Sequence, residues 1–430
     1  MKLMKFCLSL GLLLGQTLAV MAENSIVKVF DGQFMRNGSF YYYIGTNFWY
    51  GPILGSTGEG GNRERLAYEL DSLKSIGINN LRILAGADEG SQNANSVYPY
   101  LHPKTDQLND TLLIGLDYFL SELDKRDMVA VIYLNNAWDW SGGYGFYLKN
   151  AGMGDSPNAN GTGYGNYVKY AAEFVRNEKA KTFFWDFVKK IVGRTNSITG
   201  KPYKDDPAIM SWQICNEPRS FSKEGKTEFA NFIHQTARII KETDPNHLVS
   251  TGSEGSIGCE NDMTLYEQIH TDQLIDYMTI HIWPANWNWC VRSRLWEDLP
   301  NVYQQAGAYI NQHLRLANKA AKPLVIEEFG YPRDGNINDA GTYTQCRDAF
   351  YGFIMEQVAK SSKTGGNLAG CNFWGWGGKG RQANKEWKRG DDFLCDPPHE
   401  PQGWYSVFDN DSTTIEMVKR EIGKIKIDEE

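Results

Sequence analysis

The sequence predicts a single (β/α)8 TIM barrel, and three observations support this prediction. Short apolar runs alternate with segments of helical periodicity along most of the chain, which is the pattern of repeated β-α units. The chain has 430 residues, more than a minimal eight-unit barrel needs, and no linker rich in Pro, Ser and Gly divides it. Two of the apolar runs also end in carboxylates, at Glu217 and Glu328, and the parallel strands of a barrel bring such ends to one face.

The N-terminal residues predict an export signal. Two lysines precede an apolar run over 6–20, and the small residue Ala22 marks the expected cleavage point. That run is too short to span a bilayer comfortably, and no later segment offers a longer one. We therefore expect a signal peptide over 1–22, a barrel domain over 23–430, no membrane span, and a secreted or periplasmic protein.

Four β-α units are expected in the first half of the chain. Apolar residues recur at helical spacing after each expected strand, which predicts a helix there. The strands are expected over 40–47, 80–84, 128–134 and a fourth run that ends at Glu217. The helical faces consist of Leu66, Leu70, Leu73 and Ile76; Leu112, Leu116, Phe119 and Leu123; Phe183, Phe184, Phe187, Val188 and Ile191; and a fourth helix over roughly 227–243.

The second half of the chain completes the ring. Four more strands are expected over 248–251, 277–281, 324–328 and 368–374. A helix over 302–320 separates the sixth strand from the seventh, and one over 343–361 separates the last two strands. The stretch 413–427 also has helical periodicity, so we expect it to close the barrel.

Two turn signals and three long connections complete the expected architecture. Asp31-Gly32 and Asn37-Gly38 are typical of β-hairpin turns, and such an N-terminal β-hairpin could close the bottom of the barrel. The connections 135–166, 283–300 and 375–404 all follow strands and therefore belong on the C-terminal face. Loops this long in a compact domain usually carry function.

Charge and cysteine content limit the possible partners. The formal net charge is −8 and no basic cluster is present, which argues against nucleic acid or an anionic membrane as a partner. One of the seven cysteines lies in the expected signal peptide, and the even number that remains permits disulfides whose pairing the sequence does not give. Cys215 and Cys371 lie in apparent strands, so we expect free, buried thiols there. No Cys-x-x-Cys or His-x-x-x-His spacing indicates a structural metal.

Tryptophan is concentrated in the long polar connections. Any single tryptophan is most simply a core residue, but a cluster of them in Gly-rich polar segments is less easily explained in that way. Flat aromatic surfaces suit the apolar C–H face of a sugar ring. The residues concerned are Trp138, Trp140, Trp283, Trp287, Trp289, Trp296, Trp374, Trp376, Trp387 and Trp404.

The two carboxylates predict a reaction class. An arbitrary Asn-Glu-Pro is most simply a helix cap, and Glu328 alone could be a surface acid beside Glu327. Their shared position at strand ends favours catalysis instead. Hydrolysis of a glycosidic bond uses two converging carboxyls, one that protonates the leaving oxygen and one that attacks the anomeric carbon or activates water.

At this point the chain resembles glycoside hydrolase family 5, and specifically its β-1,4-mannanase group. The resemblance covers nearly all of the chain after the expected signal peptide. It implies a (β/α)8 barrel, a retaining mechanism without a cofactor, and β-mannan polysaccharide or manno-oligosaccharides as binding partners. The motifs that carry it are 45–49 (GTNFW), 80–82 (NLR), Trp138 and Trp140, 216–219 (NEPR), 281–284 (HIWP), 328–330 (EFG) and 372–376 (NFWGW).

The resemblance also implies roles for the catalytic centre. Glu217 matches the family's acid/base and Glu328 its nucleophile, which leaves Glu327 as the outward neighbour. Asn216 is expected to hydrogen-bond the sugar 2-hydroxyl. Arg82 is expected to hold the nucleophile ionised, because a nearby cation favours a charged carboxylate.

Further substrate-binding residues follow from the same resemblance. Trp374 matches the platform under the sugar at the cleavage point, and Arg219 resembles an arginine that reaches the leaving-group side. Trp138 is expected in the cleft. His281 resembles the strand-six histidine near the catalytic pair, and a structural histidine stays open as an alternative. Many family members carry a tyrosine where this chain has Trp283. An indole can donate but not accept a hydrogen bond, so an indole N–H would replace the usual phenol contact.

Several functions stay open at this level. The leading one is endo-acting hydrolysis of β-1,4-mannosidic bonds in mannan, glucomannan or galactomannan. The same carboxylates would serve an endo-β-1,4-glucanase, and a loop that blocks the cleft would give an exo-acting β-mannosidase. A non-catalytic carbohydrate-binding protein on this scaffold would be expected to lack one of the two glutamates, whereas Glu217 and Glu328 are both present.

Overall fold

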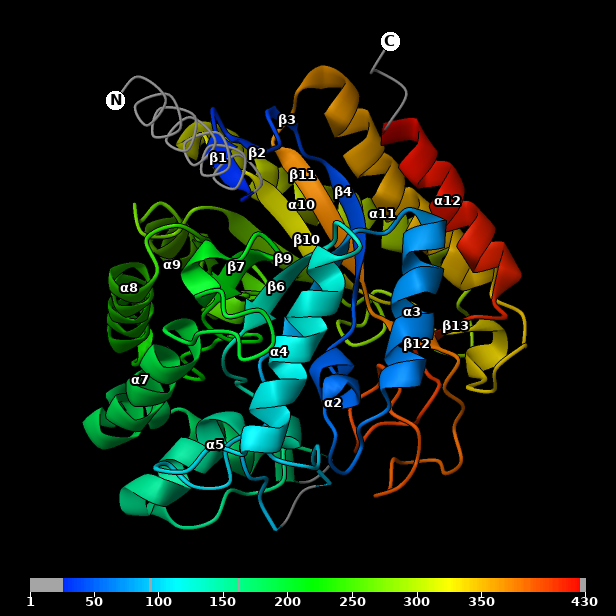
Figure 1. Cartoon of the computed structure of the whole chain (residues 1–430). Coiled ribbons are helices and arrows are strands. Elements are labelled where there is room, and N and C mark those ends of the chain that lie inside the picture. The colour runs from blue at the N-terminus through cyan, green and yellow to red at the C-terminus, as the bar shows by residue number, and fades with distance from the viewer. Residues whose placement is uncertain (1–25, 93–94, 161–162, 426–430) are drawn as a thin grey trace, which may run out of the picture.

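The computed structural model describes residues 26–92, 95–160 and 163–425. The expected signal peptide lies outside these residues. At the centre is an eight-stranded parallel sheet in the order β8-β7-β6-β5-β4-β11-β10-β9, curled into a barrel and surrounded by helices (Figure 1). The strands are β4 (Tyr43–Asn47), β5 (Asn80–Leu84), β6 (Val129–Tyr133), β7 (Ile209–Gln213), β8 (Leu248–Ser250), β9 (Met278–Ile282), β10 (Leu324–Phe329) and β11 (Leu368–Phe373).

Hydrogen bonds close the seam between the first and last strands of this order. The N–H of Asp276, just before β9, donates to the carbonyl of Val249 in β8 at 2.8 Å, and the Asp276 carboxylate accepts the N–H of Val249 at 2.6 Å. Further along, the N–H of His281 donates to the carbonyl of Glu254 at 3.1 Å. The expected barrel is therefore present, with its seam next to the loop after β8.

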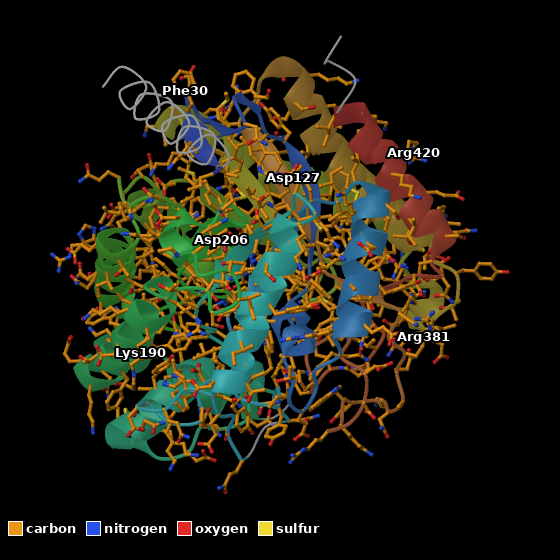
Figure 2. All side chains as sticks on the ribbon, viewed as in Figure 1. Phe30, Asp127, Lys190, Asp206, Arg381 and Arg420 are labelled. Atoms are coloured by element: carbon orange, nitrogen blue, oxygen red, sulfur yellow. The ribbon has the colours of Figure 1, made fainter. Side chains whose placement is uncertain are left out.

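Helices cover the outside of the barrel. Many of their charged residues face water, as Figure 2 shows for Lys190 on α7 and Arg420 on α12. None of the described helices is long and apolar enough to cross a membrane. The helices are α2 (Gly51–Gly55), α3 (Arg63–Ile76), α4 (Asp110–Asp124), α5 (Gly143–Leu148), α6 (Tyr164–Ala171), α7 (Glu178–Val192), α8 (Lys226–Thr243), α9 (Met263–His270), α10 (Leu299–Ala320), α11 (Gln345–Thr364) and α12 (Ser412–Ile425).

Local sequence signals set several helix ends. Asn62 caps α3 by accepting the N–H of Arg65, and Gly77 ends that helix at a φ of 97°, where an L side chain would be strained. Asn177 caps α7 in the same manner by accepting the N–H of Ala180. The side-chain oxygens satisfy backbone donors that the first helical turn leaves unpaired.

The N-terminal hairpin closes the N-terminal end of the barrel as expected. Strands β1 (Lys28–Phe30), β2 (Gln33–Arg36) and β3 (Ser39–Phe40) pair antiparallel through the two predicted turns. Phe34 is fully buried and belongs to an apolar cluster inside the barrel that includes Tyr43, Val129 and Val325. The apolar cluster thus fills the N-terminal end of the barrel interior, and the polar side chains lie at the C-terminal end.

Two details differ from the sequence-based expectation. The fourth barrel strand ends at Gln213 and not at Glu217, because the chain leaves the ladder and turns before the glutamate. The long connections also contain short helices, including α5 and α6 after β6. Cys215 and Cys371 are free and buried as expected, and the other four described cysteines are free as well.

Candidate active site

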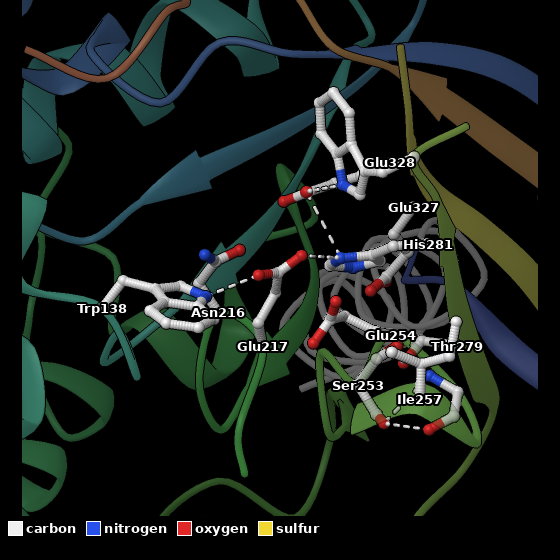
Figure 3. A network of polar contacts seen from close by, with 12 residues as sticks. Trp138, Asn216, Glu217, Ser253, Glu254, Ile257, Thr279, His281, Glu327 and Glu328 are labelled. Carbon is white, nitrogen blue, oxygen red and sulfur yellow. Dashed lines mark hydrogen bonds and ion pairs between the residues drawn. The ribbon is translucent and has the colours of Figure 1, made fainter. Parts of the chain in front are cut away.

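The two predicted carboxylates lie together at the C-terminal end of the barrel. Glu217 follows β7, and Glu328 lies in β10. One oxygen of each lies within 4.8 Å of the other and of a ring nitrogen of His281, which lies in β9. Figure 3 shows these three side chains converging. Glu217 and Glu328 also line a cavity of about 400 Å³.

Glu217 is held by its backbone as well as by its side chain. Its φ of 51° lies in the left-handed region, which costs a non-glycine residue on the order of 1 kcal/mol or more. Its N–H donates to the carbonyl of Gly252 at 3.0 Å, and the neighbouring N–H of Asn216 donates to Asn135 at 2.8 Å. The loops after β6 and β8 therefore hold a turn that would otherwise relax.

The Glu217 carboxylate has two side-chain partners. Its Oε1 lies 2.8 Å from Nδ1 of His281, and its Oε2 accepts the indole N–H of Trp138 at 2.6 Å. Dashed lines mark both contacts in Figure 3. Trp138 was expected only to line the cleft. Its indole N–H also holds the Glu217 carboxylate in place.

Three side chains orient Glu328. Its Oε1 accepts from Nη1 of Arg82 at 2.5 Å, and its Oε2 accepts the indole N–H of Trp283 at 3.2 Å. Nδ1 of His281 lies 3.3 Å from the same Oε2. The indole N–H of Trp283 therefore makes the contact to Glu328 that was expected of it.

His281 lies between the two carboxylates, and they favour its protonated form. Burial opposes its charge, but the carboxylates of Glu328 and Glu217 outweigh burial and raise the pKa of His281 to about 9. Burial alone would raise the pKa of Glu217, yet the hydrogen bond and charge of His281 bring it below its usual range. The two shifts therefore favour a proton on the imidazole, 2.8 Å from the Glu217 oxygen, over one on Glu217.

The same three groups have the spacing of a metal site, but the charge around them does not fit one. Glu217, His281 and Glu328 offer ligand atoms within 4.8 Å of one another. The guanidinium of Arg82 is bound to Glu328 and is fully buried, so a positive charge already occupies the place beside the trio. This cluster is better suited to moving protons than to holding a cation.

Glu327 is not the outward neighbour that the sequence predicted. Val325 faces the barrel interior, and strand alternation turns Glu327 to the same side, where Gln213 donates to its carboxylate at 2.6 Å and Tyr277 at 3.2 Å. Glu328 reaches the cavity because the pairing of β10 with β9 shifts register between Ile326 and Glu328. Burial is the main reason that the pKa of Glu327 is raised.

Asn216 is fixed beside the carboxylate pair. Its side-chain oxygen accepts from Nη2 of Arg82 at 2.9 Å, and its amide donates to Asn136 at 3.1 Å. One guanidinium therefore orients both Asn216 and Glu328. Because the amide is held from both ends, its orientation beside the two carboxylates is fixed.

Arg219 lies on one side of the cavity and pairs with Glu254, which the sequence did not predict as a partner. Its guanidinium lies over the Trp138 ring, 5.3 Å from the centroid, and its Nε donates to Glu254 at 2.6 Å. Burial and the negative charge of Glu217 raise the pKa of Glu254 to about 7, because together they outweigh the lowering effect of the Arg219 charge. Glu254 stands alone in a Ser- and Gly-rich stretch, so no sequence pattern singles it out.

Aromatic rings line the cavity on several sides. Trp374 lies 6.0 Å from Trp283 and 6.4 Å from Trp140 between ring centroids, in edge-to-face geometry. The predicted long connections supply most of this wall. They also contribute polar residues that the sequence analysis did not name, which are Asp139, Asn160, Asn286, His399 and Glu400.

The family comparison covers the whole described region. A model of the β-mannosidase-like group of glycoside hydrolase family 5 matches residues 24–430. A mannan endo-1,4-beta-mannosidase of Arabidopsis thaliana is 30% identical over 80% of this chain and 79% of its own length. A mannan endo-1,4-beta-mannosidase of Oryza sativa is 28% identical over 84% and 80%.

Solved structures give the same result at the level of the fold. A glycoside hydrolase family 5 mannosidase from Rhizomucor miehei is 32% identical, with a TM-score of 0.85 over 94% of this chain and 98% of that one. Another structure of that protein contains mannosyl-fructose. An endo-1,4-beta-mannanase from the same organism, 22% identical, superposes with a TM-score of 0.66 over 93% and 99%, which shows the shared barrel alone.

Proposed function

The chain belongs to the β-mannosidase-like group of glycoside hydrolase family 5, and on that premise we propose that it hydrolyses internal β-1,4-mannosidic bonds in mannan, glucomannan or galactomannan. The observation that carries the proposal is the carboxylate pair at Glu217 and Glu328, bridged by a protonated His281. The curated relatives named as mannan endo-1,4-beta-mannosidases support the choice of substrate and of internal cleavage.

The first step forms a covalent glycosyl-enzyme. Glu328 attacks the anomeric carbon of the sugar while Glu217 protonates the departing glycosidic oxygen. His281 supplies the proton, because it lies 2.8 Å from Glu217 and holds the proton in the resting site. Arg82 keeps Glu328 oriented and balances its charge until the new bond forms.

The second step releases the product. Once Glu328 is esterified its negative charge is gone, so Glu217 acts as the base that takes a proton from the attacking water. The water attacks the same carbon from the opposite side and restores Glu328. Two inversions give a product with the configuration of the substrate.

The spacing of the carboxyls supports retention. Retaining glycosidases hold the two carboxyl groups about 5–5.5 Å apart, whereas inverting ones leave roughly 6.5–9.5 Å for a water molecule. Here one oxygen of Glu217 and one of Glu328 lie within 4.8 Å of each other. A separation this small agrees with the retaining arrangement.

Exo-action on the terminal mannose is a second candidate, and a specific observation favours it. The segment 379–406 between β12 (Trp376–Gly378) and β13 (Val407–Phe408) brings His399 and Glu400 to the wall of the cavity. Side chains at that wall shorten the space for a long chain. The Rhizomucor miehei mannosidase is also closer in sequence than the mannanase from that organism.

A product profile tests both candidates. Internal cleavage lowers the viscosity of glucomannan well before reducing ends accumulate, and carboxymethyl-cellulose is cut poorly. If mannose appears first at nearly constant viscosity, the exo-acting assignment replaces the endo-acting one. Preferential cleavage of carboxymethyl-cellulose would contradict both and indicate a β-glucanase.

We also propose that the protein is exported, which rests on the basic start, the apolar run over 6–20 and Ala22. N-terminal sequencing of protein from the culture medium or periplasm tests this. A mature chain that begins at Glu23 is expected, and an uncleaved cytoplasmic chain would contradict the proposal.

A further inference from the structure

An exposed tyrosine lies on the wall of the catalytic cavity. Tyr164 begins α6 and is 47% exposed. Of the large apolar side chains that are exposed in the described part of the chain, it is the one that also lines the cavity. A single exposed aromatic residue is ordinary on a protein surface, so its exposure alone indicates nothing. Its place in the wall of this cavity is what calls for an explanation.

Contacts with Trp138 place Tyr164 on the leaving-group side. The two rings lie 6.1 Å apart between centroids, with 25° between their planes. The indole N–H of Trp138 donates to Glu217, as Figure 3 shows, and the guanidinium of Arg219 lies over the same indole. Tyr164 therefore lies one aromatic ring farther from the acid/base than Trp138, in the part of the wall that also carries Arg219.

Other side chains occupy much of the Trp138 ring. Tyr167 lies 6.0 Å from it with 23° between the planes, and Phe221 meets it edge-on at 5.4 Å, both measured between centroids. The guanidinium of Arg219 lies 5.3 Å from the centroid. These neighbours fix the indole but leave little of its face for a ligand. The open aromatic surface on this side of the cavity is therefore that of Tyr164.

The helix that carries Tyr164 is anchored. Tyr164 and Tyr167 are at i and i+3 in α6, so their side chains share one face of the helix. Tyr167 is fully buried, and its hydroxyl donates to the carbonyl of Ala137, the residue before Trp138. This contact holds α6 against the segment that carries Trp138. Because the attachment of the Tyr164 ring is fixed, a ligand that stacks on it has little further chain to order.

A flat, half-exposed phenol ring fits the apolar C–H face of a pyranose. The sugar next to the cleaved bond lies near Glu217, and therefore near Trp138 and Arg219. Tyr164 is one ring farther out, so the next sugar along the chain is the one that meets it. That sugar takes no part in the reaction and can contribute only through binding.

We propose that Tyr164 is a stacking platform for the second sugar on the leaving side of the cleaved bond. This inference rests on the proposed glycosidase function and deepens it, because it adds a binding site for a sugar that does not react. The contribution of the ring is specific for long substrates. A substrate with only one group beyond the cleaved bond does not reach it.

Two variants at this position and one control test the inference. Tyr164→Ala removes the ring, and Tyr164→Phe keeps the ring without its hydroxyl. Alanine favours a helix, so Tyr164→Ala should fold, which a melting curve would check. Tyr343→Ala makes the same change at a tyrosine that is 80% exposed and is not among the described residues that line the cavity.

Two substrates separate the platform from the catalytic centre. Mannotetraose labelled at its reducing end shows, by the length of the labelled fragment, how many sugars lie beyond the cleaved bond. Dinitrophenyl β-mannoside places only its aryl group there. Tyr164→Ala should lower kcat/KM about three- to tenfold for cuts that leave two or more sugars on the labelled fragment. It should change kcat/KM for dinitrophenyl β-mannoside by less than about twofold, and Tyr164→Phe and Tyr343→Ala should stay within about twofold on both substrates.

Two results would overturn the inference. If Tyr164→Ala matches Tyr343→Ala on mannotetraose, no sugar stacks on this ring. If Tyr164→Ala loses equally on mannotetraose and on dinitrophenyl β-mannoside, the ring acts only by supporting Trp138 and, through it, Glu217.

Failure of the inference can be separated from failure of the proposed function. If the parent protein cleaves mannotetraose and Tyr164→Ala matches the control, the inference alone is wrong. If the parent protein cleaves cellotetraose but not mannotetraose, the proposed substrate is wrong. The same variants on labelled cellotetraose then decide whether Tyr164 binds a sugar.

Discussion

The two ends of the barrel interior are built from opposite chemistry. At the N-terminal end, Phe34 of the hairpin packs edge-to-face on Tyr277, 5.2 Å between ring centroids, among Val129, Val131 and Val325. At the C-terminal end, the space is filled by charged and amide side chains, which include Arg82, Asn47, Gln213, Glu327 and Glu328. The named side chains are buried at both ends, although the C-terminal end also borders the catalytic cavity.

This difference shows where stability and activity are located. Apolar burial stabilises the fold by about 1.5–3 kcal/mol for each large side chain, whereas a buried ion pair often contributes little after its desolvation cost. Arg82 nevertheless donates to Gln213, Asn47, Glu328 and Asn216. The polar end is therefore maintained for chemistry, and substitutions at the two ends should have separable effects.

The largest effect is expected from the catalytic carboxylates. Glu217→Ala and Glu328→Ala should each lower turnover by about 10⁴-fold or more, because each deletes a step of the double displacement. Folding should be retained, as circular dichroism and melting curves would show. Azide should rescue Glu328→Ala with a glycosyl azide of inverted configuration, because azide then takes the place of the missing nucleophile.

A matched pair of variants can contradict this assignment. Glu327 neighbours Glu328 but lies in the barrel interior, bound to Gln213 and Tyr277. Glu327→Gln should lose much less activity than Glu328→Gln. If Glu328→Gln stays active while Glu327→Gln fails, the nucleophile has been assigned to the wrong residue.

The apolar end should respond in stability and not in chemistry. Phe34→Ala removes a fully buried ring and should lower the free energy of unfolding by about 3–5 kcal/mol. The kcat of the remaining folded protein should be unchanged, which active-site titration can measure. A large fall in kcat with unchanged stability would show that the two ends are coupled.

Most of the barrel could be predicted because each strand is a short apolar run with its own boundaries. Strand β5 has the expected bounds at both ends, and the hairpin follows from its Asp-Gly and Asn-Gly turns. The expected fourth strand is too long, because Glu217 lies in a turn with positive φ. That turn depends on backbone hydrogen bonds that it donates to the carbonyls of Asn135 and Gly252.

The site could be predicted only where a motif marks it. The residues expected from the motifs line one cavity or contact residues that line it. The sequence did not predict the residues that pair with them. Glu254 stands alone in its segment, and Glu327 depends on which face of β10 turns inward. Asp139 and His399 lie in long loops without periodicity, so only the folded chain shows that both residues border one cavity.

A pH effect of intermediate size is expected at the polar end. The pKa of His281 is about 9 in the folded chain, against 6.5 for an ordinary histidine. The folded state binds this proton more tightly, so the stabilisation is fully present below pH 6.5 and is lost as pH rises through 9. Its size is up to about 3 kcal/mol.

Chemical denaturation from pH 6 to pH 10 measures this effect. Wild type should lose stability over the range relative to His281→Gln, which cannot take up the proton. Equal pH dependence in the two proteins would mean that His281 is neutral in the folded site. The Phe34→Ala variant should keep the wild-type pH dependence, because its change lies at the apolar end.

A smaller effect is expected from Arg219. Arg219→Ala removes the guanidinium from Trp138 and leaves Glu254 without its cation. We expect about a tenfold loss in kcat/KM for short manno-oligosaccharides and reduced transglycosylation, with less change on long polymer. Glu254→Gln should have a similar but weaker effect. An unchanged product pattern in both variants would remove Arg219 from the leaving-group side.

The smallest effect is expected at Trp283, where the chain departs from the usual family pattern. Its indole N–H reaches Glu328 at 3.2 Å, a long hydrogen bond beside the shorter one from Arg82 at 2.5 Å. Trp283→Phe keeps an aromatic ring against Trp374 but removes this donor, so kcat/KM should fall about three- to tenfold. Trp283→Tyr restores a donor and should recover part of the loss.

Because the donor acts on the nucleophile, the fall should appear in the glycosylation step with aryl β-mannosides of poor leaving groups. If Trp283→Phe and Trp283→Tyr lose activity equally, the indole contributes through shape alone.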